Sequence, residues 1–344
     1  MGNNISRRHH VLPQTWLKAF AKDGKVLVRR RGTEQDLPQP VDKAFVVNRF
    51  YSNPAPGEES DGQEVETYLA QEVEGPAAES LNRTRAGQWP LPEAMEQNLR
   101  RLLAHQLVRS RGFRRLQQHI ERTVKPMMTA VEMAPYLEEK LGRKVGPEDL
   151  QQLATALQEK PWAPLEDAMD PRRDLTHQLK AADGVQQKLS SWNLELLRAP
   201  NDRPLLLLAD VGTVVRQADG SFSPLPPLLP DDGELLAPIA PHLLLVATPR
   251  KPTTDLRLTT KKAGAANRGA TTLCDDAVVR RPGHRWPKGR RLDPHSPHLR
   301  PPAISWTTNS EPGKANASEA RSLSDQSLAD LVQRLSTCAT NSSE

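Results

Sequence analysis

The spacing of apolar residues divides this chain into three stretches, and their order constrains the fold more than any single motif. Before residue 52, and again between residues 193 and 247, short apolar runs end at Pro, Gly or Asp, which is typical of β-strands. Between residues 63 and 192 the apolar residues recur every three or four positions, which is typical of amphipathic helices. We therefore expect an α+β protein: a mostly antiparallel sheet built from both strand-rich stretches, with a central helical segment.

The strand-rich stretches predict short elements separated by turns. The first predicts a short helix over residues 13–20, which begins with Pro in its first turn, and strands over 25–29 and 45–51. The later stretch predicts further strands, over residues 194–197, 205–210, 212–216 and 243–247. The Pro-rich residues 224–241 are interpreted as a surface loop. Residues 265–277 predict a final helix followed by a short strand.

Two long helices stand out in the central stretch. Residues 63–85 carry an apolar stripe with a spacing of four, interrupted by Gly75-Pro76. Because Pro lacks an N–H and clashes with the preceding turn, this pair predicts a kink or a split. A second helix is predicted from about residue 92 to residue 124, and shorter helices over residues 148–159 and 175–192.

Composition changes again near the C-terminus. We expect one domain over residues 8–282 and a mostly disordered tail over residues 283–344, which is rich in Pro, Arg and Ser. The formal net charge of the chain is +5, and residues 280–300 alone hold six Arg and one Lys against one Asp. Nucleic acid is therefore a candidate partner for the basic residues 280–300, which include Trp286, and a solubilising linker is the alternative interpretation.

Several function classes lack their motifs here. The chain has no Gly-rich dinucleotide or P-loop motif, no Gly-x-Ser-x-Gly and no His-Glu-x-x-His. Its two cysteines, Cys274 and Cys338, are too far apart in sequence to suggest a disulfide framework or a zinc site. The longest apolar runs are far shorter than the roughly 20 residues of a membrane span. We expect a cytoplasmic protein that does not associate with membranes.

Five polar residues interrupt or end apolar patterns. His9 and His10 are adjacent, so in a strand their side chains point to opposite faces and one of them, His10 by preference, faces a site. Gln106 and Arg109 share one face of a helix, and Gln106 interrupts its apolar stripe. Asp210 ends a buried strand, where a carboxylate serves either a site or the next turn. For each of these residues a structural role, in packing or in satisfying local backbone groups, is the alternative interpretation.

The run from His9 to Phe20, which begins His-His-Val-Leu-Pro-Gln, resembles the opening of an uncharacterised bacterial family, domain of unknown function 4238. Similar segments follow in the same order; they are Arg49-Phe50-Tyr51 and the ranges 66–78, 104–109, 206–215 and 237–246. This chain departs from the family pattern at Ala209, where Ser is usual, and at the Val211-Gly212-Thr213 turn, where Pro is usual. The family brings no established reaction, so the resemblance implies a fold and not a mechanism.

Our leading hypothesis is a cytoplasmic hydrolase, nuclease-like in its chemistry, acting in phage defence or toxicity. The proposed site collects six side chains, namely His9, His10, Gln14, Gln106, Arg109 and Asp210. In this hypothesis a histidine acts as base or metal ligand, Asp210 as ligand or orienting group, and Arg109 binds an anionic group such as phosphate. A divalent metal is one candidate cofactor. The alternative is a non-enzymatic binding module that recognises a nucleotide, a peptide or nucleic acid.

Overall fold

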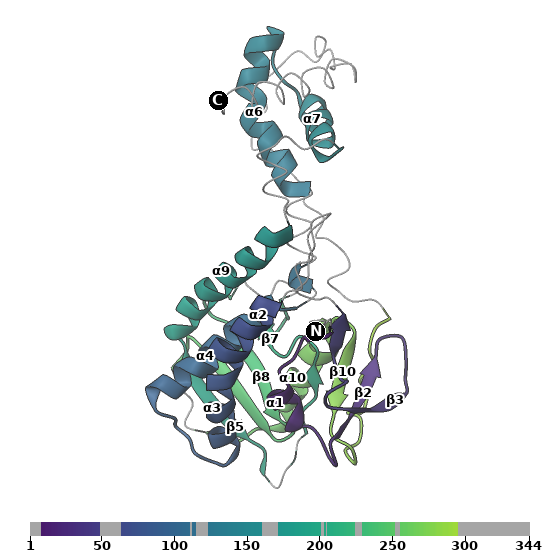
Figure 1. Cartoon of the computed structure of the whole chain (residues 1–344), viewed down its shortest axis with the longest axis vertical. Helices are drawn as coiled ribbons and strands as arrows, with labels where there is room; N and C mark the ends of the chain where they lie inside the picture. Colours follow the sequence, from purple (N-terminus) through teal and green to yellow (C-terminus); the bar gives the residue numbers. More distant parts are fainter. Residues whose placement is uncertain are drawn as a thin grey trace, which may run out of the picture. The chain divides into compact units, whose positions relative to one another are not determined.

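The structure is a computed structural model that describes residues 8–48, 63–110, 112–114, 123–159, 171–200, 203, 205–223, 229–251 and 255–294. The chain forms two compact units (Figure 1). Unit 1 comprises Met1–Arg115 and Leu175–Arg300, and unit 2 comprises Leu116–Asp174 and Pro301–Glu344. Helices and antiparallel sheets together confirm the predicted α+β class. The single domain over residues 8–282 stays a prediction, and most of the predicted disordered tail, residues 295–344, lies outside the described ranges.

The described residues of unit 1 form three sheets, in which every pair of neighbouring strands is antiparallel. A two-stranded sheet pairs β1 (Arg8–His10) with β4 (Val46–Asn48). A second sheet has the order β3 (Asp36–Pro40), β2 (Lys25–Arg30), β10 (Ala277–Arg280), β6 (Leu208–Ala209). The third has the order β5 (Asn193–Arg198), β9 (Leu243–Thr248), β8 (Glu234–Ala240), β7 (Val214–Arg216). Strands from both ends of the sequence share the second sheet, as predicted.

Strand β8 corrects the interpretation of residues 224–241 as a surface loop. Its residues from Leu235 to Ala240 are buried, and it lies between β9 and β7 in the sheet. A strand buried on both faces has no polar alternation, so its sequence does not show the pattern of a half-buried strand. Pro238 is accommodated because the pairing with β9 shifts register between Pro238 and Ala240.

Strand β3 was not predicted either. It contains Pro38 and Pro40, residues that lack the N–H a central strand needs. β3 lies at the edge of its sheet and pairs only with β2 among the described strands, so the missing donors cost little. Proline at an edge also hinders pairing with another chain.

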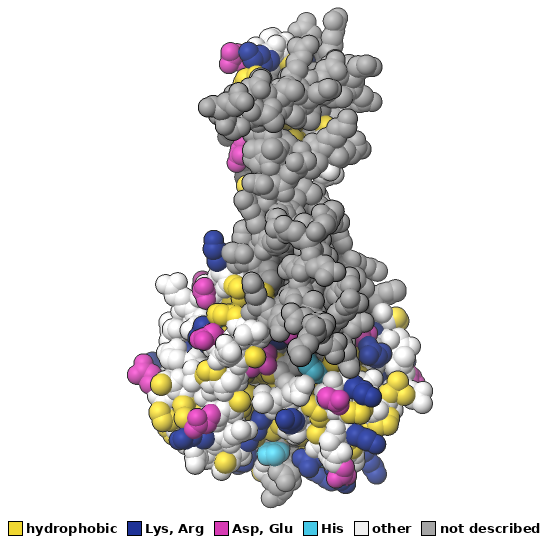
Figure 2. All heavy atoms as spheres, viewed as in Figure 1, with side chains coloured by type: hydrophobic (Ala, Val, Ile, Leu, Met, Phe, Trp, Pro, Cys, Tyr) yellow, Lys and Arg dark blue, Asp and Glu magenta, His cyan; other side chains and the backbone are white. Residues whose placement is uncertain are grey.

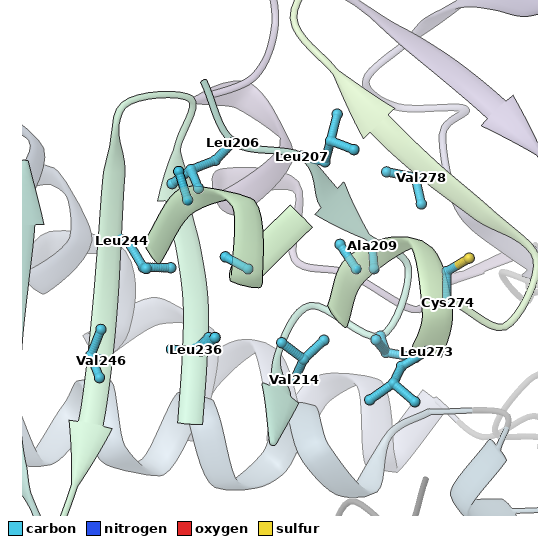
Figure 3. Packing of buried hydrophobic residues seen from close by; sticks show 14 of the residues in the cluster. Leu206, Leu207, Ala209, Val214, Leu236, Leu244, Val246, Leu273, Cys274 and Val278 are labelled. Atoms are coloured by element: carbon cyan, nitrogen blue, oxygen red, sulfur yellow. The ribbon is translucent and has the colours of Figure 1, made fainter. Parts of the chain in front are cut away.

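The main core of unit 1 lies around α10 (Thr260–Leu273), which contacts β6, β7 and β8 (Figure 3). Buried side chains of this core come from the second and third sheets and from α10; they include Leu206, Ala209, Val214, Leu236, Val246, Leu273 and Val278. Burying a side chain of this size contributes about 1.5–3 kcal/mol. Strand β8 also contacts α3 (Gly75–Arg85), so both α10 and α3 pack against this strand.

The first long helix is divided by a π-helical turn at the predicted Gly75-Pro76 position. It consists of α2 (Gln63–Tyr68), the π-helical turn η1 (Leu69–Glu74) and α3. The Gly75 N–H donates to the carbonyl of Ala70, five residues back. Pro76 cannot donate to the preceding turn, and the widened turn accommodates this lost bond. Turns of this kind occur frequently at functional sites.

The second long helix ends earlier than predicted. α4 (Glu93–Val108) ends before Arg109, whose N–H donates to the His105 carbonyl. Residues 109–110 are not helical, and residues 112–114 form a short helical piece. Side chains bind the backbone after this end: Ser110 Oγ accepts the Phe113 N–H at 3.0 Å, and Asp275 Oδ2 accepts the Gly112 N–H at 3.1 Å. These bonds satisfy amides that a continuous helix would have paired. Unit 1 also contains α1 (Gln14–Lys18) and, from Leu175 onward, α9 (Pro171–Ser190).

Unit 2 contains α6 (Lys125–Leu141) and α7 (Pro147–Glu159), which pack through Ala130, Leu137 and three residues of α7, namely Leu153, Ala154 and Leu157. Gly142 ends α6 with a left-handed backbone, φ 63°, which glycine adopts without strain. Across the described ranges, no helix is both long enough and apolar enough to cross a membrane.

Candidate functional site

A cavity of about 410 Å³ opens on unit 1 beside β1. Its lining comes from the β1–α1 segment, from α2 and η1, and from the end of α4: His10, Gln14, Thr15, Glu66, Thr67, Leu69, Ala70, Glu74 and Arg109. The volume lies within the range of small-molecule sites, and the lining combines a few polar groups with an apolar wall. Three of the residues predicted for a site, His10, Gln14 and Arg109, lie here together.

The two adjacent histidines have different surroundings, as the strand geometry requires. His9 is fully buried, whereas His10 is half-buried and lines the cavity. The Gln14 amide nitrogen lies 2.9 Å from His10 Nε2. An amide nitrogen only donates, so Nε2 accepts this bond and the neutral ring carries its proton on Nδ1. Pro13, which precedes the first helical residue, starts α1 so that Gln14 returns toward β1.

Arg109 connects three parts of the cavity wall. Its Nη1 donates to Glu74 Oε1 at 2.6 Å, and its Nη2 donates to the His10 carbonyl at 2.9 Å. The side chain is 6% exposed, so these are buried charge-assisted bonds. The guanidinium therefore holds β1 against the π-helical turn, and two of its donors already serve the protein itself.

Glu66 is the titratable side chain in the cavity whose protonation is displaced. Burial raises its pKa above the usual value, the guanidinium of Arg109 lowers it, and the carboxylate of Glu74 raises it again. The net direction is upward, so Glu66 keeps its proton to a higher pH than an exposed glutamate. Displaced pKa values in a cavity are typical of catalytic acids and bases.

Gln106 lies beneath the cavity and does not line it. Its side chain is fully buried and donates to the Val11 carbonyl at 3.1 Å and to the Val211 carbonyl at 3.5 Å. It thereby joins the segment after β1 to the turn between β6 and β7. Gly212 makes this approach feasible: its φ is 72°, and a Cβ there would lie 2.6 Å from Gln106 Cγ. The unusual Val211-Gly212-Thr213 turn is thus explained by packing.

Asp210 does not line the cavity either. Its Oδ1 accepts the Asp275 N–H at 2.8 Å, and its Oδ2 accepts the N–H groups of Asp276 and Ala277 at 2.7 and 3.1 Å. Burial and the nearby Asp275 raise the pKa of Asp210 and the three backbone bonds lower it, with a net increase to about 7. These contacts assign Asp210 to the junction of β6 with the start of β10, where it satisfies backbone amides.

A family model described as "Protein of unknown function (DUF4238)" matches residues 8–284. The chain belongs to this family. No match was found among curated proteins, and none among solved structures. The match confirms the resemblance of the His9–Phe20 segment. It spans every residue that lines the cavity, so the cavity is built entirely within the DUF4238 region.

The two carboxylates of this DUF4238 cavity, Glu66 and Glu74, were missed as site residues by the analysis of sequence alone. They belong to a run of glutamates that favours a solvated helix face, and Glu72 in that run is indeed exposed. Their spacing of eight residues was the available signal, because it aligns them on one side of a helix. The π-helical turn between them, which places Glu74 beside Arg109, is not marked by periodicity.

The part of the chain that the structure describes contains no group of three or more His, Cys, Asp or Glu side chains arranged to hold a metal ion. His10 and Asp210, the predicted ligands, serve the cavity and the β6–β10 junction respectively. A divalent metal cofactor for this DUF4238 protein therefore stays a prediction.

His105, next to Gln106 on α4, should make the stability of the protein pH-dependent. Burial, together with the smaller effect of the charges of Arg109 and Arg101, lowers the pKa of His105 to about 4. Below about pH 6.5 the unfolded chain binds a proton at His105 that the folded chain does not bind. The free energy of unfolding therefore falls as the pH drops below about 6.5. Between pH 7 and pH 5 we expect a loss of about 2 kcal/mol from this residue.

Urea unfolding of the wild type and of His105→Gln at both pH values checks this expectation. Glutamine does not titrate, so the variant should lose about 2 kcal/mol less than the wild type on acidification, whatever its absolute stability. Equal losses in the two proteins would show that His105 is not the neutral buried group described above.

Proposed function

We propose that this member of the DUF4238 family is a hydrolase, with the cavity as its active site and with His10 and Glu66 as its acid–base pair. One observation carries the proposal: a histidine and a carboxyl group with a raised pKa line the same cavity. Catalysis by a positioned acid and base needs two such groups with different proton affinities. The cytoplasmic location and the role in phage defence stay predictions beside it.

The environments of the two groups suggest their roles. The raised pKa of Glu66 favours its protonated form, which suits a general acid. Nε2 of the neutral His10 ring has a lone pair that accepts a proton, so His10 suits a general base. His10 Nε2 would accept a proton from water, the resulting oxygen would attack the substrate, and Glu66 would donate its proton to the leaving group. For this step the Gln14 amide releases Nε2 and becomes available to bind the substrate.

The charge of the lining favours an uncharged substrate over a phosphate. With Glu66 protonated, as a general acid requires, the charges of Glu74 and Arg109 balance each other among the described lining residues. Two Arg109 donors already bind Glu74 and the His10 carbonyl. A phosphate would have to displace a carboxylate at 2.6 Å, which is an unfavourable exchange in a partly buried site. We therefore favour hydrolysis of an ester, amide or glycosidic bond over the nuclease-like reaction.

A binding module is the second candidate. The observation that favours it is the engagement of His10 Nε2 and Arg109 in bonds within the protein, which leaves a preformed cavity of suitable size. In this case a ligand binds in the cavity and leaves unchanged.

A panel of chromogenic esters, amides, glycosides and phosphodiesters, assayed with the purified full chain, tests the hydrolase. For a substrate that is turned over, His10→Ala and Glu66→Gln should each lower kcat/KM by about 100-fold, because each removes one proton-transfer group. The matched control is Glu72→Gln, the same substitution on an exposed neighbour in the same helical segment, and it should retain full activity.

Hydrolysis that survives both His10→Ala and Glu66→Gln would contradict the assignment. If no compound is hydrolysed, but fragments bind with chemical-shift changes that disappear in His10→Ala, the binding module is the better description.

A further inference from the structure

Residues 280–291, here called the basic segment, belong to unit 1. The residues of this segment after Arg280 form no helix or strand. Trp286 packs against the main core, and its Nε1 donates to the Arg290 carbonyl at 2.6 Å. Just beyond the segment, Leu292 is buried in the same core, and the carbonyl of Asp293 accepts a bond from Arg31 at 2.9 Å. The segment is therefore held in place at both its centre and its end.

The basic segment contains six cationic side chains and no carboxylate. Three more arginines, Arg29, Arg30 and Arg31, adjoin it through β2 and the following turn. The acidic side chains of this region are Glu34, Asp36, Asp276 and Asp293. Nine positive against four negative charges leave an excess of five, which equals the formal net charge of the whole chain, +5. The rest of the protein is therefore neutral overall, and its positive charge is concentrated here.

The buried and exposed cations of this region have different roles. Asp36 pairs with Arg29 at 2.8 Å and with Arg280 at 2.5 Å, which fixes these two arginines in the sheet. Arg285, Lys288 and Arg291 are exposed instead. Figure 2 shows Lys and Arg side chains gathered over the part of unit 1 where β2 and β3 lie. Exposed cations on a fixed support lose little freedom on binding, which favours contacts with a polyanion.

We infer that the basic segment and β2 form a binding face for the phosphate backbone of duplex nucleic acid. Arginine matches phosphate geometry with two donors, and three exposed cations within seven residues suit a repeating array of phosphates. Trp286 is covered by Arg29, whose Cζ lies 3.9 Å from the ring centroid. It is thus not free to stack on unpaired bases or to enter a lipid surface, which disfavours single strands and membranes.

This binding face is separate from the cavity in its residues and in its chemistry. None of the cavity-lining residues belongs to the basic segment, and the described cavity lining contains two carboxyl groups and one guanidinium. The inference consequently stands or fails independently of the proposed hydrolase.

Fluorescence anisotropy with a short labelled DNA duplex, titrated with the full chain at several salt concentrations, tests the inference. The variant Arg285→Glu/Lys288→Glu/Arg291→Glu should bind at least about tenfold more weakly near 0.1 M salt. The slope of log Kd against log salt should fall by about 3, since each lost phosphate contact removes about one unit. The control is Lys43→Glu/Lys180→Glu/Lys251→Glu, which makes the same change in net charge at exposed lysines elsewhere.

The control variant should retain most of the wild-type affinity and salt dependence. Equal weakening of the two variants would overturn the inference, because the effect would then come from net charge alone. Wild-type binding to phosphatidylcholine–phosphatidylserine vesicles, without binding to the duplex, would also overturn it and would assign the face to anionic lipid. Circular dichroism of both variants shows whether each is folded before binding is compared.

Discussion

Replacing Arg109 by leucine is expected to lower the free energy of unfolding by about 3 kcal/mol. The substitution leaves the Glu74 carboxylate and the His10 carbonyl without the donors that bind them at 2.6 and 2.9 Å. Arg109 is almost fully buried and the Glu74 side chain is 24% exposed, so water replaces these bonds poorly. Removing one partner of a buried ion pair costs far more than the pair itself contributes, because a charge stays behind.

Arg83→Leu is the control for this prediction. Arg83 pairs with Glu79 one helical turn away on α3, but both side chains are well exposed, 45% and 62%. Loss of such a surface pair should change stability by less than about 0.5 kcal/mol. Urea unfolding of both variants makes the comparison. An Arg109→Leu protein as stable as Arg83→Leu would imply that Arg109 is a free substrate-binding group, as the sequence suggested, and not a structural connection.

Asp210→Asn is expected to destabilise the protein by about 2 kcal/mol. Both carboxylate oxygens accept backbone N–H groups, from Asp275, Asp276 and Ala277. An asparagine has a single oxygen, so whichever way the amide turns, its NH₂ group faces at least one backbone donor. A buried donor left in this state costs about 1–3 kcal/mol.

Removing the negative charge of Asp210 opposes the loss of its hydrogen bonds. Burial and the neighbouring Asp275 raise the pKa of Asp210, so removing its charge also relieves an unfavourable interaction. Asp219→Asn is the matched control, because Asp219 Oδ1 also accepts a backbone N–H, from Ser221 at 2.8 Å, but in an exposed turn. Its loss of stability should be much smaller. An Asp210→Asn protein that is more stable than the wild type would show that charge repulsion outweighs the three bonds.

Much of this fold follows from local pattern. Strand β2 and helices α7 and α10 were predicted because each has one apolar and one polar face, which imposes a period on the sequence. Strand β8 was not, because it is buried on both faces and contains Pro238 at a register shift. Its place between two strands depends on partners far away in sequence, which a local pattern does not record.

The candidate site likewise combines features that local sequence predicts with features that depend on distant partners. The alternation of His9 and His10 follows from strand geometry alone, and the two side chains do lie in different surroundings. The roles of Gln106, Arg109 and Asp210 depend on backbone carbonyl and amide groups supplied by distant turns. Polar residues in apolar surroundings signal that such partners exist, but they do not tell whether the partner is a ligand or the protein's own backbone.

We propose that His10 and Glu66 act in one reaction step within one cavity. The most direct measurement is kcat/KM of the double variant His10→Ala/Glu66→Gln beside the two single variants, on a substrate that the wild type hydrolyses. Groups that act together are not additive, so the double variant should lie within about tenfold of the weaker single variant. A double variant reduced by the product of the two single losses, or single variants as active as Glu72→Gln, would contradict the claim.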